Sequence, residues 1–232
     1  MHIMEGFLPH PWWEVWYALS LPVVIYGIYK INQLAKERRE TLPLLALAGA
    51  FIFVLSSLKL PSVTGSCSHP TGAGMGAIIF GPAITAVLCL IVLVYQALFL
   101  AHGGISTLGA NVFSMGIVGP VVAYLVYRGC MRSKLNFYVS IFFAAFLADL
   151  ATYLVTSLQL ALAFPSATGG VLGSLGAFGT VFALTQVPLA IVEGVITALI
   201  FKYIIQVKGD VMVRLKVIDD KRLGKLKEMI SA

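Results

Sequence analysis

The sequence has few charged residues. Only 11% of its 232 residues are charged, while 59% are hydrophobic. A soluble domain usually carries about 25% charged residues, and this chain could not cover a water-exposed surface with so few. Several apolar runs reach the roughly 20 residues that a helix needs to cross a bilayer. They are apolar on every face, which excludes the alternating strands of a transmembrane barrel. The composition predicts an all-α, polytopic transmembrane helical bundle.

Motifs of ATPases and of common hydrolases are also absent. The sequence contains no G-x-x-x-x-G-K-[ST] phosphate loop, so ATP hydrolysis by that route would have to come from other subunits. It contains neither H-E-x-x-H nor G-x-S-x-G. Three cysteines without framework spacing indicate no disulfide scaffold. The start of the chain lacks the basic stretch and the cleavage site of a secretory signal peptide, so we expect Met1 to be retained.

Five apolar runs predict membrane helices over residues 12–34, 41–58, 108–127, 135–163 and 178–206. The remaining stretch, 74–102, is too long for one crossing and too short for two. Gly81 and Pro82 interrupt it, and a proline inside a helix removes a hydrogen bond and kinks or breaks the helix. We therefore interpret it as a short or broken segment, 74–82, paired with a second segment, 83–102.

The net charge of +6 comes from basic clusters between the apolar runs, and it indicates cytoplasmic loops rather than nucleic-acid binding. If 74–102 enters and returns, every main cluster falls on the same side, as the positive-inside rule expects. The prediction is a bundle of seven segments with the N-terminus outside and the C-terminus cytoplasmic. Residues 1–207 form the transmembrane domain, and residues 208–232 form a charged cytoplasmic tail.

Histidine at position 2 makes the N-terminus a candidate metal chelate. The Met1 amine, the His2 amide nitrogen and the His2 Nδ1 can bind one ion in nearly coplanar geometry. Such a donor set favours ions that accept square-planar nitrogen ligands, such as Ni(II) and Cu(II). His69 is the best candidate for the fourth position. Chance alone also produces Met-His starts, and a lone loop histidine is more often not a ligand.

Other polar residues have competing interpretations. His10 precedes two tryptophans and is better interpreted as an interfacial residue. Cys67 could ligate a soft ion but is more typical of packing. Asp149 and Glu193 fall within apolar runs, where a carboxylate is costly and usually functional. The alternative is that each accepts hydrogen bonds from a neighbouring helix or faces a partner subunit.

Three motifs carry a family resemblance. The start MHIMEGFLP, residues 66–72 (SCSHPTG) and residues 96–111 (QALFLAHGGISTLGAN) strongly resemble the CbiM/NikM group. Members of this group are substrate-binding membrane components of energy-coupling-factor cobalt and nickel transporters. The resemblance runs from residue 1 to about 206, excludes the tail, and does not separate nickel from cobalt importers.

The resemblance implies a metal held by Met1, His2 and His69 in a seven-helix bundle of a prokaryotic cytoplasmic membrane. His102 and Asn111 are candidates for a second shell that orients a metal-bound imidazole. Ni(II) or Co(II) is the expected transported substrate, and no cofactor is expected. The implied partners are a transmembrane coupling subunit, two ATPase subunits and a small accessory membrane subunit.

The sequence thus predicts a high-affinity Ni(II)/Co(II) capture subunit of an ATP-driven importer, not an enzyme. Two alternatives remain at this point. One is an intramembrane enzyme that uses Asp149 and Glu193 as a carboxylate pair. The other is a stand-alone secondary metal transporter.

Overall fold

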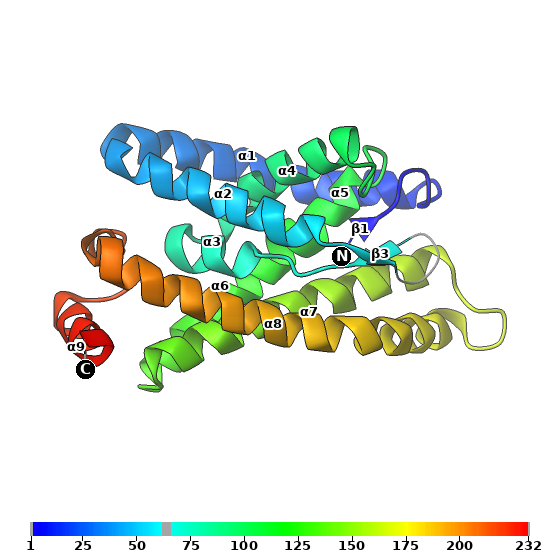
Figure 1. Cartoon of the computed structure of the whole chain (residues 1–232). Coiled ribbons are helices and arrows are strands. Elements are labelled where there is room, and N and C mark those ends of the chain that lie inside the picture. The colour runs from blue at the N-terminus through cyan, green and yellow to red at the C-terminus, as the bar shows by residue number, and fades with distance from the viewer. Residues whose placement is uncertain (1, 62–65, 232) are drawn as a thin grey trace.

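The computed structural model describes residues 2–61 and 66–231 and is mostly helical (Figure 1). Its six longest helices are α1 (Trp12–Glu37), α2 (Leu42–Ser57), α4 (Pro82–Phe99), α6 (Gly119–Arg132), α7 (Phe137–Ala163) and α8 (Gly170–Arg214). Shorter helical segments are η1 (Arg39–Thr41), α3 (Ala73–Phe80), α5 (Leu108–Asn111), the π-helical η2 (Val112–Val118) and α9 (Asp220–Ser231). The strands β1 (His2–Ile3), β2 (Leu60–Pro61) and β3 (Ser66–Ser68) form one small antiparallel sheet in the order β1-β3-β2.

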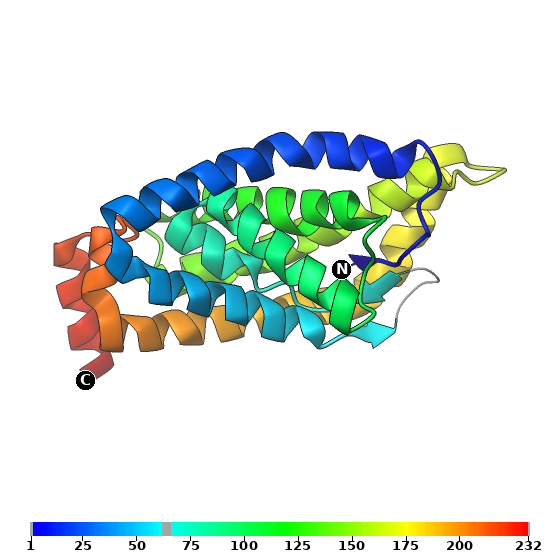
Figure 2. The same ribbon diagram turned by 90° about the horizontal axis from the view of Figure 1, so that it is seen from above.

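The helices lie roughly along one long axis (Figures 1 and 2). Helix α7 packs along α8, and α1 packs along α4. At the α1–α4 contact, a Cβ added to Gly27 would lie only 2.1 Å from the Ala83 carbonyl oxygen, so glycine permits this close approach. The sheet lies toward one end of the bundle, and α9 lies at the opposite end (Figure 1).

Five helical stretches are long and apolar enough to cross a membrane, namely Arg39–Ser57, Pro82–Phe99, Leu108–Arg132, Phe137–Ala163 and Gly170–Arg214. A helical membrane protein is therefore confirmed, whereas the predicted count of seven segments is not. Helix α1 has 26 residues but falls outside this apolar set. Helix α3 has 8 residues, too few to cross a hydrocarbon core that needs about 20.

The helix break expected at Gly81-Pro82 is present. Helix α3 ends at Phe80, Gly81 adopts a φ of +85°, and α4 begins at Pro82. Glycine tolerates this positive φ because it has no Cβ, and proline is suited to a first helical turn because its missing N–H has no partner there. Residues 73–79 of α3 are all buried, so the broken segment lies inside the bundle. Irregular backbone at membrane depth is tolerated where protein surrounds it.

The basic segments lie together at the end of the bundle that is far from the sheet (Figure 1). There the guanidinium of Arg38 donates to the carbonyl of Arg214, and Arg222 Nη1 lies 3.3 Å from Met131 Sδ. Lys208 has non-helical dihedral angles, which kink α8 near the predicted boundary between residues 207 and 208. That boundary remains a prediction, because a kink does not by itself define a domain.

Candidate metal centre

The N-terminal segment is held in place by backbone pairing. In the β1–β3 ladder His2 lies opposite Cys67, and Ile3 lies opposite Ser66. The Asn111 side chain accepts a hydrogen bond from the Ile3 N–H at 2.8 Å and donates to the Ile3 carbonyl at 3.0 Å. The start of the chain is thereby tied to β3 and to α5.

The loop before α5 holds the next residues. Glu5 accepts hydrogen bonds from the Ser106 N–H at 3.1 and 3.2 Å, and the Gly6 N–H donates to the Ser106 hydroxyl at 2.9 Å. A Cβ at Gly104 would lie 2.4 Å from the Glu5 Cα, so only glycine allows the N-terminal segment to cross this loop. These contacts place His2 at a defined position instead of leaving it on a loose end.

His69 reaches the same place from the segment between β3 and α3. Its Nδ1 lies 2.8 Å from the Pro70 carbonyl oxygen. A carbonyl only accepts, so Nδ1 carries the proton and Nε2 keeps its lone pair. His69 Nε2 is buried and has no hydrogen-bond partner among the described residues. This is the arrangement of an imidazole prepared to bind a metal through Nε2, since the other nitrogen fixes the tautomer.

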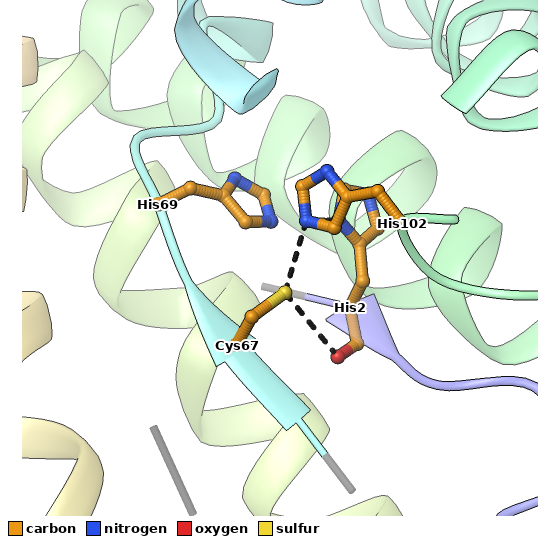
Figure 3. A group of neighbouring side chains, drawn as sticks. All are labelled: His2, Cys67, His69 and His102. Carbon is orange, nitrogen blue, oxygen red and sulfur yellow. Dashed lines mark hydrogen bonds between the residues drawn. The ribbon is translucent and has the colours of Figure 1, made fainter. Parts of the chain in front are cut away.

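Three imidazoles and one thiol gather here (Figure 3). The rings of His2 and His69 are stacked, with centroids 4.3 Å apart and planes 25° apart. The His102 ring stands edge-on to the His2 ring at 4.3 Å. His102 Nε2 lies 2.9 Å from both His2 Nδ1 and Cys67 Sγ. One donor atom from each of the four residues lies within 4.8 Å of the others, and all four residues are buried.

Burial sets the protonation of this cluster. It is the largest cause that lowers the pKa of His2 and His69 well below the usual value, and the neighbouring rings add to the effect. Burial also lowers the pKa of His102 to about 3 and raises the pKa of Cys67. At neutral pH the imidazoles are therefore uncharged, as metal ligation requires, and the thiol keeps its proton.

Glu193 and Gln186 of α8 hold the segment that carries His69, and Asp149 fixes Gln186. Glu193 on α8 accepts hydrogen bonds from the Thr71 hydroxyl at 2.8 Å and the Gly72 N–H at 2.9 Å, and also from the Thr71 N–H. Gln186, two turns earlier on α8, donates to the His69 carbonyl at 2.9 Å and to both oxygens of Asp149 at 2.8 Å. The role that the sequence left open for these carboxylates is thus a hydrogen-bonding one.

The structure brings together some of the predicted site residues and separates others. His2 and His69 meet, and His102 contacts the His2 ring directly. The Asn111 side chain instead hydrogen-bonds to the Ile3 backbone and the Thr107 hydroxyl. Met1 lies outside the described residues. His10 is exposed and pairs with Glu14 at 2.6 Å, away from the cluster.

A packing role was predicted for Cys67, whereas the structure places its Sγ among the donor atoms. The signal available in the sequence was its position two residues before His69 in a short extended segment, where alternate side chains share a face.

Comparison with known proteins gives a consistent picture. Residues 2–211 match the model of the CbiM family, described as the cobalt uptake substrate-specific transmembrane region. A putative cobalt transport protein CbiM 2 from Methanosarcina barkeri is 66% identical over 231 residues, covering 98% of both chains. A cobalt transport protein CbiM from Chlorobium limicola is 58% identical, covering 88% of this chain and 80% of the relative.

Solved structures extend the comparison to the fold. A crystal structure described as a transition metal transporter superposes with a TM-score of 0.78 at 30% identity, covering 89% of this chain and 93% of that chain. A truncated transition metal transporter superposes with a TM-score of 0.77 over 89% of this chain.

Proposed function

The chain belongs to the CbiM family of substrate-specific components for cobalt uptake, and from this premise we propose that it captures Ni(II) or Co(II) with high affinity at its histidine cluster. It is a multi-pass prokaryotic membrane protein and a transport component, not an enzyme. Cobalt is the metal named in the description of the family. We propose Ni(II) as well, because a plane of nitrogen donors also suits this ion.

The proposed ligands are the Met1 amine, the His2 amide nitrogen, the His2 Nδ1 and the His69 Nε2. The observation that carries the proposal is the stacked pair of buried rings, in which His69 presents an unpartnered Nε2. His102 is the proposed second-shell residue, because its Nε2 lies 2.9 Å from both Cys67 Sγ and His2 Nδ1. Metal binding by His2 Nδ1 would break the contact between the two imidazoles, so His102 would then keep only its contact with Cys67. Asn111 supports the site one step further out by fixing the backbone that follows His2.

The proposed topology has seven segments, with α1 and the short α3 added to the five apolar stretches. The histidine cluster then faces outward and the basic end faces the cytoplasm. The position of the basic segments together at one end supports this arrangement, since cytoplasmic loops are enriched in lysine and arginine. The proposal divides the chain into a metal-binding transmembrane domain, 1–207, and a cytoplasmic tail, 208–232.

We further propose that release is driven by partners: a transmembrane coupling subunit, two ATPases and a small accessory membrane subunit. The absence of a phosphate loop from the sequence supports an external energy source. The enzyme alternative is wrong, because the relatives are transport proteins. A stand-alone secondary transporter would instead show proton-coupled metal flux in liposomes that contain this chain alone.

Metal analysis of N-terminal variants tests the ligand set. The untagged chain and a C-terminally tagged chain should each hold one nickel or cobalt ion. Two residues fused ahead of Met1 should abolish binding, because the free amine is a proposed ligand. An extended chain that still holds one ion, with an unchanged absorption spectrum, would contradict the proposed site.

A further inference from the structure

A cavity of about 1000 Å³ opens at the basic end of the bundle, far from the histidine cluster. Its walls come from α1, the α3–α4 break, α6 and the segment from α8 to α9. Apolar side chains such as Ile79 and Phe80 form part of the lining, and five cations surround it: Lys30, Arg128, Arg132, Lys216 and Arg222. The proposed capture of metal does not use this cavity.

The charge of the lining is positive. Two acids, Asp219 and Asp220, share the cavity with the five cations, so the formal balance is 5 − 2 = +3. At this end of the molecule, Arg214 pairs with Glu40 and Asp210, and none of the five lining cations takes part in these two ion pairs. Like charges around one cavity repel each other, and a bound anion relieves that repulsion.

Neighbouring tyrosine side chains hold two of these cations in place. The Arg128 guanidinium lies 5.0 Å from the Tyr124 ring centroid and donates to its hydroxyl at 2.7 Å. Lys30 Nζ lies 5.5 Å from the Tyr26 ring centroid. Cations that are oriented in advance lose less conformational entropy when they bind a ligand.

The positive charge and the apolar wall of the cavity together indicate which class of ligand fits it. A cation lining of this kind repels divalent metal ions, so the cavity is unsuited to hold the metal on its way through the protein. A purely apolar ligand would leave the cations without partners. Basic pockets between transmembrane helices at a membrane surface suit the headgroups of acidic lipids. The apolar wall beside the cations fits the start of the acyl chains.

We propose that this cavity binds the headgroup of an acidic phospholipid, with Arg128 and Arg222 as its principal phosphate partners. Arginine is placed in this role because its planar guanidinium offers two parallel donors to phosphate oxygens. The two guanidinium groups come from different walls, α6 and α9, so a bound headgroup would bridge them.

The test measures lipid binding to the purified full chain in neutral detergent. Phosphatidylglycerol should remain bound in native mass spectrometry and raise the melting temperature, whereas phosphatidylcholine should do neither. The double variant Arg128→Gln/Arg222→Gln should bind phosphatidylglycerol about 30-fold more weakly, since each cation near an anionic lipid contributes about a fivefold factor. Its lipid-free melting temperature, compared with that of the parent, verifies that the variant folds.

The matched control is Lys36→Gln/Arg39→Gln, which removes two exposed cations outside the cavity at the same end. The control should bind phosphatidylglycerol within about twofold of the parent, because general surface attraction is not the proposed cause. Equal losses in the two double variants, or equal binding of both lipids by the parent, would overturn the proposal. Inorganic phosphate that displaces the lipid and gives the same melting shift would assign the cavity to a free anion and overturn the lipid assignment.

Discussion

At the residue scale, the site depends on two imidazoles from distant parts of the chain. The stacked rings of His2 and His69 come from the N-terminal strand and from the segment after β3. The proposed ligand atom of His69, its Nε2, is buried and has no hydrogen-bond partner among the described residues. The proposed ligand atom of His2, its Nδ1, lies 2.9 Å from His102 Nε2. A buried nitrogen without a partner is costly unless a ligand satisfies it, so the His69 ring favours an occupied site.

Substitution of either imidazole should remove the metal. We expect His2→Ala and His69→Ala each to abolish stoichiometric binding of nickel and cobalt in calorimetry, while the helical content measured by circular dichroism is retained. His10→Ala is the matched control, because His10 is exposed and lies outside the cluster. Parent-like affinity in either cluster variant would show that the proposed ligands are wrong.

The lowered histidine pKa values predict how the stability of the metal-free protein depends on pH. In the unfolded chain a histidine binds a proton with a pKa near 6.5, whereas burial lowers the pKa of the three cluster histidines. Below about pH 6.5 the unfolded state therefore binds more protons, and the free energy of unfolding falls. As the pH falls, each histidine lowers the free energy of unfolding by up to about 1.4 kcal/mol per pH unit, until the pH reaches its folded-state pKa.

Denaturant unfolding of the metal-free chain at pH 7, 6 and 5 checks this dependence. The variant His69→Gln should show a shallower loss of stability than the parent, because one buried titrating ring is gone. The control His10→Gln changes only an exposed ring. A parent whose stability is constant over this range would refute the claim that the cluster is neutral in the folded state.

At the element scale, α8 holds the segment that carries His69. Thr185 lies 2.8 Å from the Ser68 hydroxyl, Gln186 donates to the His69 carbonyl, and Glu193 accepts from Thr71 and Gly72. These contacts span two turns of one helix, so a displacement of α8 would pull on the segment that carries His69. In the proposed site, Glu193 and Gln186 therefore position His69 and are not ligands themselves.

Loss of these contacts should weaken metal binding without changing its geometry. Glu193→Gln replaces one acceptor oxygen with an NH₂ group that faces backbone donors, and Gln186→Leu removes the donor to His69. We expect a loss of affinity of about 10–100-fold in each, the range typical of second-shell partners, with unchanged stoichiometry and absorption spectrum. Thr197→Val, one turn beyond Glu193 on α8, is the control, because its hydroxyl has no partner among the described residues. Parent-like dissociation rates in both test variants would contradict a positioning role.

At the scale of the whole molecule, the small sheet that carries His2 and Cys67 lies toward one end and the basic segments lie at the other (Figure 1). The chain reaches this arrangement because the short α3 and the longer α4 meet at a break, which returns the chain toward the end from which it came. The proposed orientation places the histidine end outside the cell.

Cysteine labelling in intact cells tests that orientation. A cysteine at the exposed Ile105 should react with a membrane-impermeant maleimide, whereas one at the exposed Ser133 should react only after lysis. Ser68 is buried, so a cysteine at that position would not report the orientation. The probes are best placed in a Cys130→Ser variant, because Cys130 is the partly exposed native cysteine that could itself be labelled, whereas Cys67 and Cys89 are buried. Labelling at Ser133 from outside would invert the proposed topology.

Much of the fold was predictable because it depends on local properties of the chain. Long apolar runs predict membrane helices, and the helix break at Gly81-Pro82 follows from the φ freedom of glycine and the missing N–H of proline. The number of membrane segments was harder to predict, since α1 and α3 differ from the other helices in apolar character or length.

The site was predictable only in part. The start of the chain indicated a chelate at His2, and the motif at 66–72 indicated His69, because both patterns are local in sequence. The meeting of His102 with His2 is a contact between residues 100 positions apart, so no local pattern predicts its 2.9 Å distance. No local pattern predicted the position of Cys67 either, because a lone cysteine is more often a packing residue than a metal ligand.

The sequence by itself determined that this chain is a helical membrane protein of the CbiM family, because hydropathy, helix breakers and motif residues act through local chemistry. Only the tertiary structure decided which polar groups meet. Glu193 and Gln186 hold the segment that carries His69, and Asp149 accepts from Gln186. His102 joins the cluster, and His10 stays outside it. The physical reason is that helix packing determines where loops and buried side chains come together, and packing depends on contacts between residues far apart in the chain.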